Sequence, residues 1–306
     1  MRKKIFATGM GGCVGHYLYD ELKKNDEFEF IFLIRSPEKV KYDTSKINVI
    51  KDEFKNIKKY AEIIKDADYI IHLLADWGGE EGNFQETIDF FNCIDTNKTE
   101  KILYFSTASI LGKDNKPNIS VKTCGTPYIR GKYKFYEKLL SMPHYKKTVI
   151  LYLTWVLGGD KNHPYSHAYY AIKSGVKFID IIKFFSVDIN FHFIHSKDIA
   201  QIAYFLLKND TKEKEFILGN EPITADIFIE KMCQVLSKNN PKFKINFPIE
   251  PTIKLAKFFG KKFSDWDEYC IGNRKLTFNV VNPASFGLTP YYPKIEKILE
   301  EIFQTR

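Results

Sequence analysis

The sequence predicts an α/β fold, in which helices cover both faces of a doubly wound parallel sheet and a smaller C-terminal lobe is interwoven with it. Short apolar runs alternate with longer amphipathic stretches through the first half of the chain. The runs are continuous rather than interrupted by polar residues, as strands buried on both faces require. Regular alternation of such strands with helices is typical of a parallel sheet whose crossover helices cover it.

The order of these runs gives the elements of the sheet. Continuous apolar runs predict strands over Lys4–Thr8, Phe28–Arg35, Ile47–Ile50, Tyr69–Leu74, Lys101–Ser106 and Thr148–Leu157. The stretches between them predict helices over Gly15–Asn25, Ile57–Lys65, Phe84–Thr96 and Tyr128–Leu140. We therefore expect one continuous sheet within the first 160 residues.

After Gly158 the chain changes character. We expect further elements over Ala168–Ser174, His195–Lys208, Glu215–Gly219, Thr224–Ser237 and Pro293–Phe303, with an aromatic-rich segment from Phe178 to Phe193. No low-complexity linker separates the two parts. We expect residues 1–160 to form the main domain, with 190–220 returning to it, and residues 161–189 and 221–306 to form the smaller lobe.

Composition limits the classes of function. Lys and Arg total 46 against 38 for Asp and Glu, which gives a net charge of +8 in 306 residues. The lysines are scattered, so we expect an anionic small molecule rather than nucleic acid as partner. No apolar stretch approaches the ~20 residues that span a bilayer, so no membrane is expected. Five widely spaced cysteines without a CxxC pair predict reduced thiols in a cytoplasmic protein and no metal site.

A glycine-rich loop joins the first strand to the first helix. Its residues are Gly9, Met10, Gly11, Gly12, Cys13, Val14 and Gly15, in the pattern Gly-x-x-Gly-x-x-Gly. Glycines let the backbone approach a pyrophosphate, which the free N–H groups and dipole of the helix N-terminus stabilise. The flanking strand and helix supply the context that such a motif needs. The loop predicts a Rossmann-type dinucleotide-binding domain over residues 1–160 and makes the smaller lobe the candidate substrate lobe.

The end of the second strand bears on which dinucleotide binds. The strand ends in Arg35, where an acidic residue would bond the ribose 2′-OH of NAD and an Arg would accommodate the 2′-phosphate of NADP. NADP is therefore favoured over NAD, although an Arg stacked on the adenine of NAD, or a solvated Arg, gives the same sequence. Asp52, after the third strand, is placed to accept a hydrogen bond from the adenine amino group.

Tyr128 and Lys132 form a Tyr-x-x-x-Lys pair at the start of a predicted helix. The spacing puts both side chains on one helical face. A nearby ammonium is expected to lower the phenol pKa from ~10 and make Tyr128 a general acid and base near neutrality. Thr107 follows a strand whose C-terminal end faces the ligand crevice, and is expected to orient a substrate oxygen beside Tyr128.

With these motifs in place, the chain resembles the extended short-chain dehydrogenase/reductase family, of the NAD-dependent epimerase/dehydratase type. The resemblance makes Tyr128, Lys132 and Thr107 catalytic and assigns Asn83 to a proton path. Leu74 and Ala75, after the fourth strand, join the cofactor site together with Tyr128 and Lys132. For the substrate it points to Trp77, Ser109, Trp155 and Arg274, with core packing as an equal alternative for Trp77.

Departures from the family pattern bear on the substrate. Ala108-Ser109 follow Thr107 where 4,6-dehydratases carry Asp-Glu, so elimination of water is disfavoured. Phe191 stands where an Arg often holds the diphosphate, and Arg274 is the candidate replacement. The His163/His167 and His192/His195 pairs lack a third ligand nearby in the sequence, so no metal is expected.

The resemblance implies an NAD(P)-dependent enzyme that oxidises, reduces or epimerises C4 of a nucleotide-activated sugar, for surface polysaccharide synthesis and as a homodimer. Arg35 and Phe191 keep open an NADPH-dependent reductase of a small non-nucleotide ketone or aldehyde. A non-catalytic dinucleotide-sensing protein is the alternative from another class, and the intact Tyr128–Lys132 pair argues against it.

Overall fold

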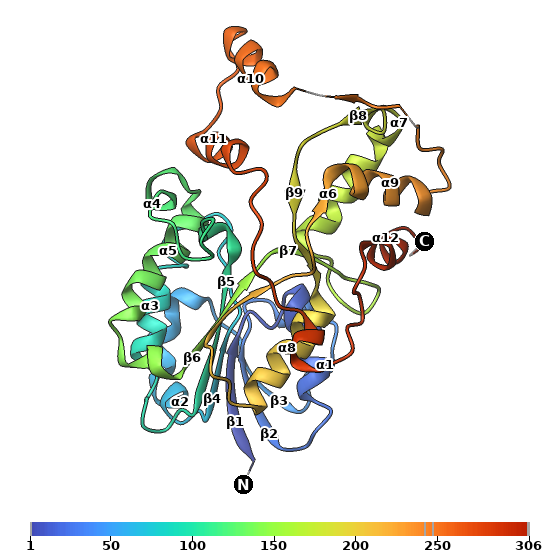
Figure 1. Ribbon diagram of the computed structural model, residues 1–306. Coiled ribbons are helices and arrows are strands. Elements are labelled where there is room, and N and C mark those ends of the chain that lie inside the picture. Colours follow the sequence, from blue (N-terminus) through green and yellow to red (C-terminus); the bar gives the residue numbers. More distant parts are fainter. Residues whose placement is uncertain (1, 242, 247, 305–306) are drawn as a thin grey trace.

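The computed structural model describes residues 2–241, 243–246 and 248–304. Its centre is a seven-stranded parallel sheet in the order β11-β6-β5-β4-β1-β2-β3 (Figure 1). The strands are β1 (Lys3–Thr8), β2 (Phe28–Leu33), β3 (Ile47–Ile50), β4 (Tyr69–His72), β5 (Lys101–Thr107), β6 (Thr148–Leu153) and β11 (Glu215–Leu218). The predicted doubly wound α/β fold is confirmed.

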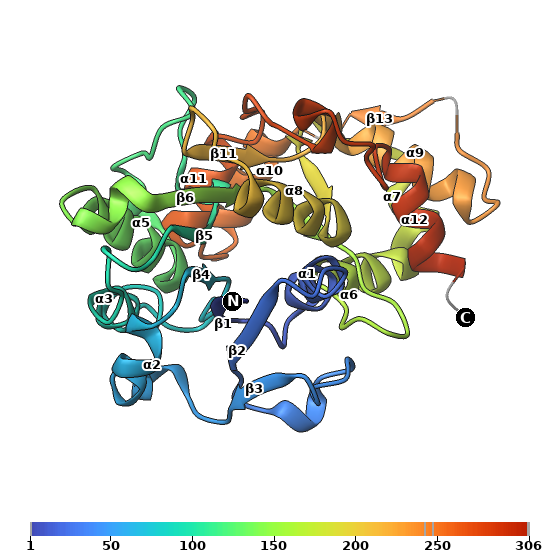
Figure 2. The same ribbon diagram turned by 90° about the horizontal axis from the view of Figure 1, so that it is seen from below.

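Helices cover both faces of this sheet (Figure 2). On one face lie α1 (Cys13–Leu22) and α8 (Ser196–Lys208), which pack together over one apolar core. The other face carries α3 (Gln85–Asn92), α5 (Pro127–Leu140) and the segment that begins as a 3₁₀ helix, η2 (Phe54–Tyr60), and ends as α2 (Ala61–Lys65). The helix predicted over Ile57–Lys65 is thus α-helical only in its second half.

The strand predicted over Thr148–Leu157 is wrong as a single element. The chain leaves the main sheet at Thr154, whose N–H and hydroxyl both donate to the carbonyl of Leu218. Beyond it, β7 (Trp155–Leu157) pairs with β10 (Phe193–His195) in a separate two-stranded sheet. This exit directs the chain from the main sheet into the C-terminal lobe.

The C-terminal lobe has a core of its own. It is built from α6 (His167–Gly175), α7 (Ile179–Ile182), α9 (Ala225–Val235) and α12 (Ile295–Gln304), which pack with β7 and β10. Short pairs of strands complete it: β9 (Asn190–Phe191) with β12 (Ile223–Thr224), and β8 (Phe185–Ser186) with β13 (Ile245–Asn246). The residues between 190 and 220 supply β10, α8 and β11, and β11 is an edge strand of the main sheet.

A segment after β13 crosses from the lobe to the main domain. It contains α10 (Ile249–Phe258) and α11 (Asp265–Gly272), seen at the top of Figure 1. Its far end packs beside α4 (Val121–Cys124), where the Asn118 amide donates to the Tyr269 hydroxyl at 3.2 Å. The segment therefore connects the C-terminal lobe to the main domain through the contact of α11 with α4.

Short 3₁₀ turns complete the described elements: η1 (Pro37–Lys39), η3 (Ala108–Ile110), η4 (Pro143–Lys147), η5 (Val176–Phe178) and η6 (Pro283–Phe286). Within the described ranges, every helix is too short or too polar to cross a bilayer.

Candidate active site

The glycine-rich loop follows β1 and packs directly on the end of β4. Gly9 has φ +83°, and a Cβ there would lie 2.5 Å from the backbone nitrogen of Leu74. A Cβ on Gly15 would lie 2.6 Å from the Cα of Met10, so the loop and α1 also meet without room for a side chain. Gly12 caps α1 with no side-chain cap, and Gly11 and Gly12 are exposed. The first N–H groups of α1 are thus left for an anion, which fits a pyrophosphate.

Tyr128, Lys132 and Thr107 converge beside that loop. Thr107 is the last residue of β5, and its hydroxyl hydrogen-bonds the hydroxyl of Tyr128 on the first turn of α5. One turn further on, the Lys132 ammonium donates to the carbonyls of Phe105 at 3.0 Å and Leu74 at 3.3 Å. The helix therefore places both side chains of the Tyr-x-x-x-Lys pair at the ends of β4 and β5.

Burial sets the charge states of this pair. The Lys132 side chain is 1% exposed, and its burial lowers the pKa to about 7. Burial raises the pKa of Tyr128 to about 12, against the opposing effect of the Thr107 hydrogen bond. The expected lowering of the Tyr128 pKa by Lys132 is therefore wrong for the chain without cofactor. At neutral pH Tyr128 is protonated, ready to donate its proton.

A loop between β4 and α3 lies over Tyr128. The indole of Trp77 stacks on the Tyr128 ring, with centroids 4.8 Å apart, and also touches His167 at the start of α6, 4.9 Å away. Trp77 is 60% exposed, which removes core packing as its role. Trp77 thus lies between Tyr128 of α5 and His167 of α6.

Asn83 holds this loop in shape. Its side-chain amide donates to the carbonyls of Asp76 at 2.6 Å and Gly79 at 2.8 Å, and its carbonyl oxygen accepts from the N–H of Asp76 at 3.2 Å. Asn83 is 1% exposed. The structure thus engages the Asn83 amide with the backbone beside Trp77 rather than directing it toward Lys132.

The match to a family model decides which family these residues represent. The model of the "NAD dependent epimerase/dehydratase family" matches residues 5–219, about two thirds of the chain. The chain belongs to this family. The resemblance inferred from the motifs is therefore confirmed, and with it an NAD-dependent type of enzyme with a nicotinamide dinucleotide as cofactor.

Solved structures share the fold at low sequence identity. The gox2253 protein is 17% identical, with a TM-score of 0.74 over 99% of this chain and 97% of its own. A UDP-N-acetylglucosamine 4-epimerase from Methanobrevibacter ruminantium M1, in complex with UDP-N-acetylmuramic acid, is 19% identical, with a TM-score of 0.64 and the same coverage. A dTDP-glucose 4,6-dehydratase from Bacillus anthracis in complex with NAD is 16% identical, with a TM-score of 0.66 over 99% and 96%. None of the curated proteins compared with the chain matches it.

The two side chains expected at the adenosine end of the cofactor site, Arg35 and Asp52, differ in their contacts. Arg35 follows β2, is exposed, and makes no hydrogen bond or ion pair within the described residues. The Asp52 carboxylate accepts from the side chains of Asn56 at 2.7 Å and Tyr60 at 2.8 Å, and these bonds lower its pKa to about 2. Asp52 thus fixes its own turn beside the expected adenine position.

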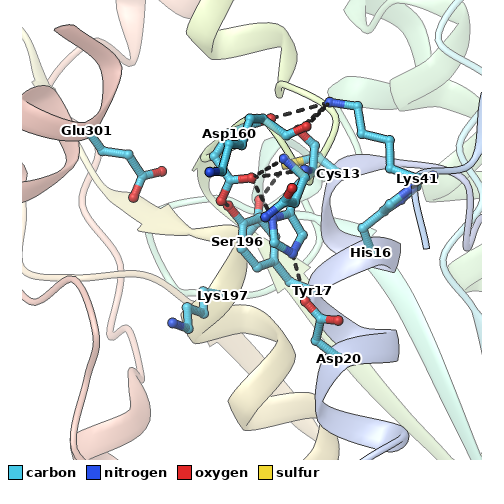
Figure 3. Close-up of polar contacts among 12 residues, drawn as sticks. Cys13, His16, Tyr17, Asp20, Lys41, Asp160, Ser196, Lys197 and Glu301 are labelled. Atoms are coloured by element: carbon cyan, nitrogen blue, oxygen red, sulfur yellow. Dashed lines mark hydrogen bonds and ion pairs between the residues drawn. The ribbon is translucent and has the colours of Figure 1, made fainter. Parts of the chain in front are cut away.

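Beyond the glycine loop, α1 is fastened to a loop of the C-terminal lobe (Figure 3). The His163 ring, stacked on Tyr17 of α1, hydrogen-bonds Asp20 at 2.7 Å and Asp160 at 2.8 Å. Lys41 donates to the carbonyls of residues 160, 161 and 163. His163 therefore joins two parts of the protein, a role that sequence spacing did not suggest. His72 was missed in the same way: its buried ring hydrogen-bonds Thr8 of β1 at 2.8 Å.

The predicted substrate residues lie in different surroundings. Ser109 is exposed, one turn after Thr107, and its N–H donates to the Thr107 hydroxyl oxygen. Trp155 packs against Phe191 and Phe228, with ring centroids 5.3 and 5.7 Å away. Arg274 forms ion pairs with Glu250 and Asp188. The structure therefore places Trp77 beside Tyr128 and Ser109 beside Thr107, whereas Trp155 and Arg274 lie next to β9 of the C-terminal lobe.

The histidine pairs weighed as metal ligands do not meet as clusters. Among the residues described, no group of three or more His, Cys, Asp and Glu side chains is arranged to hold a metal ion. His163 binds carboxylates, and His192 binds the backbone of residues 220 and 278. These contacts indicate structural roles for His163 and His192.

Proposed function

We propose that the protein oxidises, reduces or epimerises C4 of a nucleotide-activated sugar with a nicotinamide dinucleotide, to supply surface polysaccharide synthesis. The observation that carries the proposal is the convergence of Thr107, Tyr128 and Lys132 at the ends of β4 and β5, beside the glycine loop. A hydroxyl, a phenol and an ammonium meet there next to a phosphate-binding turn. This set suits proton transfer to or from an alcohol oxygen.

Tyr128 exchanges a proton with the substrate oxygen, and Thr107 orients that oxygen. A nicotinamide dinucleotide held by the glycine loop and Lys132 would supply or accept the hydride at the carbon that bears this oxygen. Because the pKa of Tyr128 is about 12 in the chain without cofactor, donation to a carbonyl oxygen is the direction that these residues favour unaided. Oxidation of an alcohol requires a stabilised phenolate, which the charges of Lys132 and an oxidised nicotinamide favour.

Several features support a nucleotide sugar as the substrate. The similar structures include a UDP-N-acetylglucosamine 4-epimerase bound to a UDP-sugar, over nearly the full length of both chains. Trp77 offers an exposed aromatic face beside Tyr128, on which the apolar face of a hexose can stack. Arg274 provides a cation for the diphosphate in place of the Arg that Phe191 replaces. Elimination of water is disfavoured, since Ala108 and Ser109 follow Thr107.

Arg35 and Phe191 favour the second candidate, an NADPH-dependent reductase of a small ketone or aldehyde. Within the described part of the chain, the exposed Arg35 has no partner to give up before meeting a 2′-phosphate. The choice of NADP over NAD depends on this residue alone, whereas several of the similar structures hold NAD. A homodimer in the cytoplasm completes the proposal, and all five cysteines are free thiols, as expected in that compartment.

Incubation of the purified protein with UDP-, GDP- and dTDP-hexoses tests the proposal. Mass analysis of the copurifying dinucleotide first identifies the cofactor, and NMR then reports the configuration at C4. For an epimerase, deuterium placed at C4 of the substrate should remain in the product, because the hydride returns from the same cofactor. A dehydrogenase should instead transfer the deuterium to the nicotinamide. If no nucleotide sugar reacts and small ketones oxidise NADPH, the second candidate replaces the first.

A further inference from the structure

Arg274 stands where three separate segments of the C-terminal lobe meet. It follows α11, and its carbonyl accepts from the N–H of Asn190 in β9. The next residue of β9, Phe191, packs on Trp155, one of the predicted substrate residues. The Arg274 backbone therefore borders the aromatic wall of the expected substrate region.

The guanidinium of Arg274 is paired with carboxylates. Its Nη2 lies 2.5 Å from Oε1 of Glu250, in the first turn of α10, and 3.9 Å from Oδ2 of Asp188. Its Nη1 donates to the carbonyl of Ile271. Asp188 also pairs with Lys275 at 2.5 Å, so Glu250 is the partner that neutralises Arg274 most directly.

Two features of this pair point to an exchangeable anion. The Nε–H of Arg274 is buried and has no hydrogen-bond partner among the residues that the structure describes, so the guanidinium retains an unused donor. The Glu250 side chain is 59% exposed, whereas that of Arg274 is 19% exposed. An exposed carboxylate holds its partner weakly. A phosphate, with more acceptor oxygens, binds a guanidinium through two parallel hydrogen bonds.

We propose that Glu250 occupies the place of the substrate's diphosphate on Arg274 and is displaced when a nucleoside diphosphate sugar binds. This inference rests on the proposed function and adds a residue that sets affinity. Arg274 exchanges one anionic partner for another, and its Nε–H gains an acceptor. Release of Glu250 frees the start of α10 from Arg274. Glu250 thus weakens the binding of the diphosphate and leaves the catalytic residues unchanged.

Calorimetric titration of inorganic pyrophosphate and of UDP tests the exchange, with NAD at saturation to fill the glycine loop. Glu250→Gln should tighten both ligands about 3- to 10-fold, because the competing charge is gone. Arg274→Gln should weaken both at least 10-fold and abolish the effect of Glu250→Gln in the double variant. Glu268→Gln is the matched control: Glu268 is similarly exposed and pairs with Lys257 at 2.6 Å, away from Arg274. It should leave both affinities unchanged.

Thermal melts and the variant Arg274→Lys, which retains the charge, distinguish lost binding from lost folding. Equal affinities for Glu250→Gln, Glu268→Gln and the unaltered protein would overturn the inference, as would absence of pyrophosphate binding in all of them. The outcome is separate from the proposed function. If the protein turns over a nucleotide sugar but Glu250→Gln does not change ligand affinity, only the proposed exchange at Arg274 is refuted. If Glu250→Gln binds pyrophosphate more tightly but no nucleotide sugar is turned over, only the proposed substrate is refuted.

Discussion

The catalytic side and the substrate side of the proposed site are held in different ways. Lys132 and Asn83 are almost fully buried and bond to backbone carbonyls, those of Lys132 in β5 and just after β4 and those of Asn83 in the loop that follows β4. On the substrate side, Trp155 and Arg274 contact the side chains of Phe228 and Glu250, which come from other segments of the lobe. Hydrogen bonds to the backbone hold a side chain whatever the neighbouring residue types are, whereas a contact between two side chains can be lost by a single substitution. The comparison suggests a preorganised reaction centre served by an adaptable specificity region.

Removal of the Tyr128 hydroxyl is expected to give the largest effect. Tyr128→Phe keeps the ring that stacks on Trp77 and removes the proton donor. Steady-state kinetics on the identified substrate should show kcat reduced about 10²- to 10⁴-fold, with cofactor affinity within about twofold of the unaltered value. Tyr136→Phe, two turns further along α5, serves as the control. Unchanged turnover in Tyr128→Phe would show that Tyr128 is not the proton donor.

A substitution of Lys132 tests whether burial of its ammonium lowers the stability of the folded protein. Its pKa of about 7 in the folded chain lies below the 10.5 of an unperturbed lysine, so the unfolded state binds more protons between these values. The contribution of this group to stability therefore rises with pH from about 7 to 10.5, and the full penalty remains below pH 7. Lys132→Met removes the penalty and loses two hydrogen bonds to backbone carbonyls.

We expect Lys132→Met to raise the free energy of unfolding of the cofactor-free protein by about 2 kcal/mol at pH 6 and to lose activity. The gain should shrink as the pH approaches 9.5. Urea unfolding at several pH values measures it, with Lys138→Met, an exposed residue at the end of α5, as control. A destabilised Lys132→Met protein at pH 6 would mean that the two hydrogen bonds outweigh the cost of burying the ammonium.

The same division separates what the sequence predicted from what it did not. Continuous apolar runs located the strands, and the glycine loop and the Tyr128–Lys132 spacing located the motifs, since these signals lie within a few residues of one another. The exit at Thr154 was missed, because whether a strand stays in a sheet depends on a partner, here β10, about forty residues away. The Arg274–Glu250 pair was missed for a similar reason. Burial, which reversed the expected shift of the Tyr128 pKa, is also a property of the folded chain.

Arg35 is an exception to the contrast between a buried catalytic side and a more exposed substrate side. It is expected on the cofactor side, yet it is exposed and unpaired among the described residues. If it meets a 2′-phosphate, Arg35→Asp should weaken NADPH binding about 10-fold or more, through loss of a charge-assisted bond and added repulsion. NADH affinity should change less than about threefold. Fluorescence titration with both cofactors measures the ratio. Lys39→Asp, at the end of η1, controls for the general change in charge. Equal weakening of NADPH and NADH by Arg35→Asp would assign the residue to adenine stacking, which serves both cofactors alike.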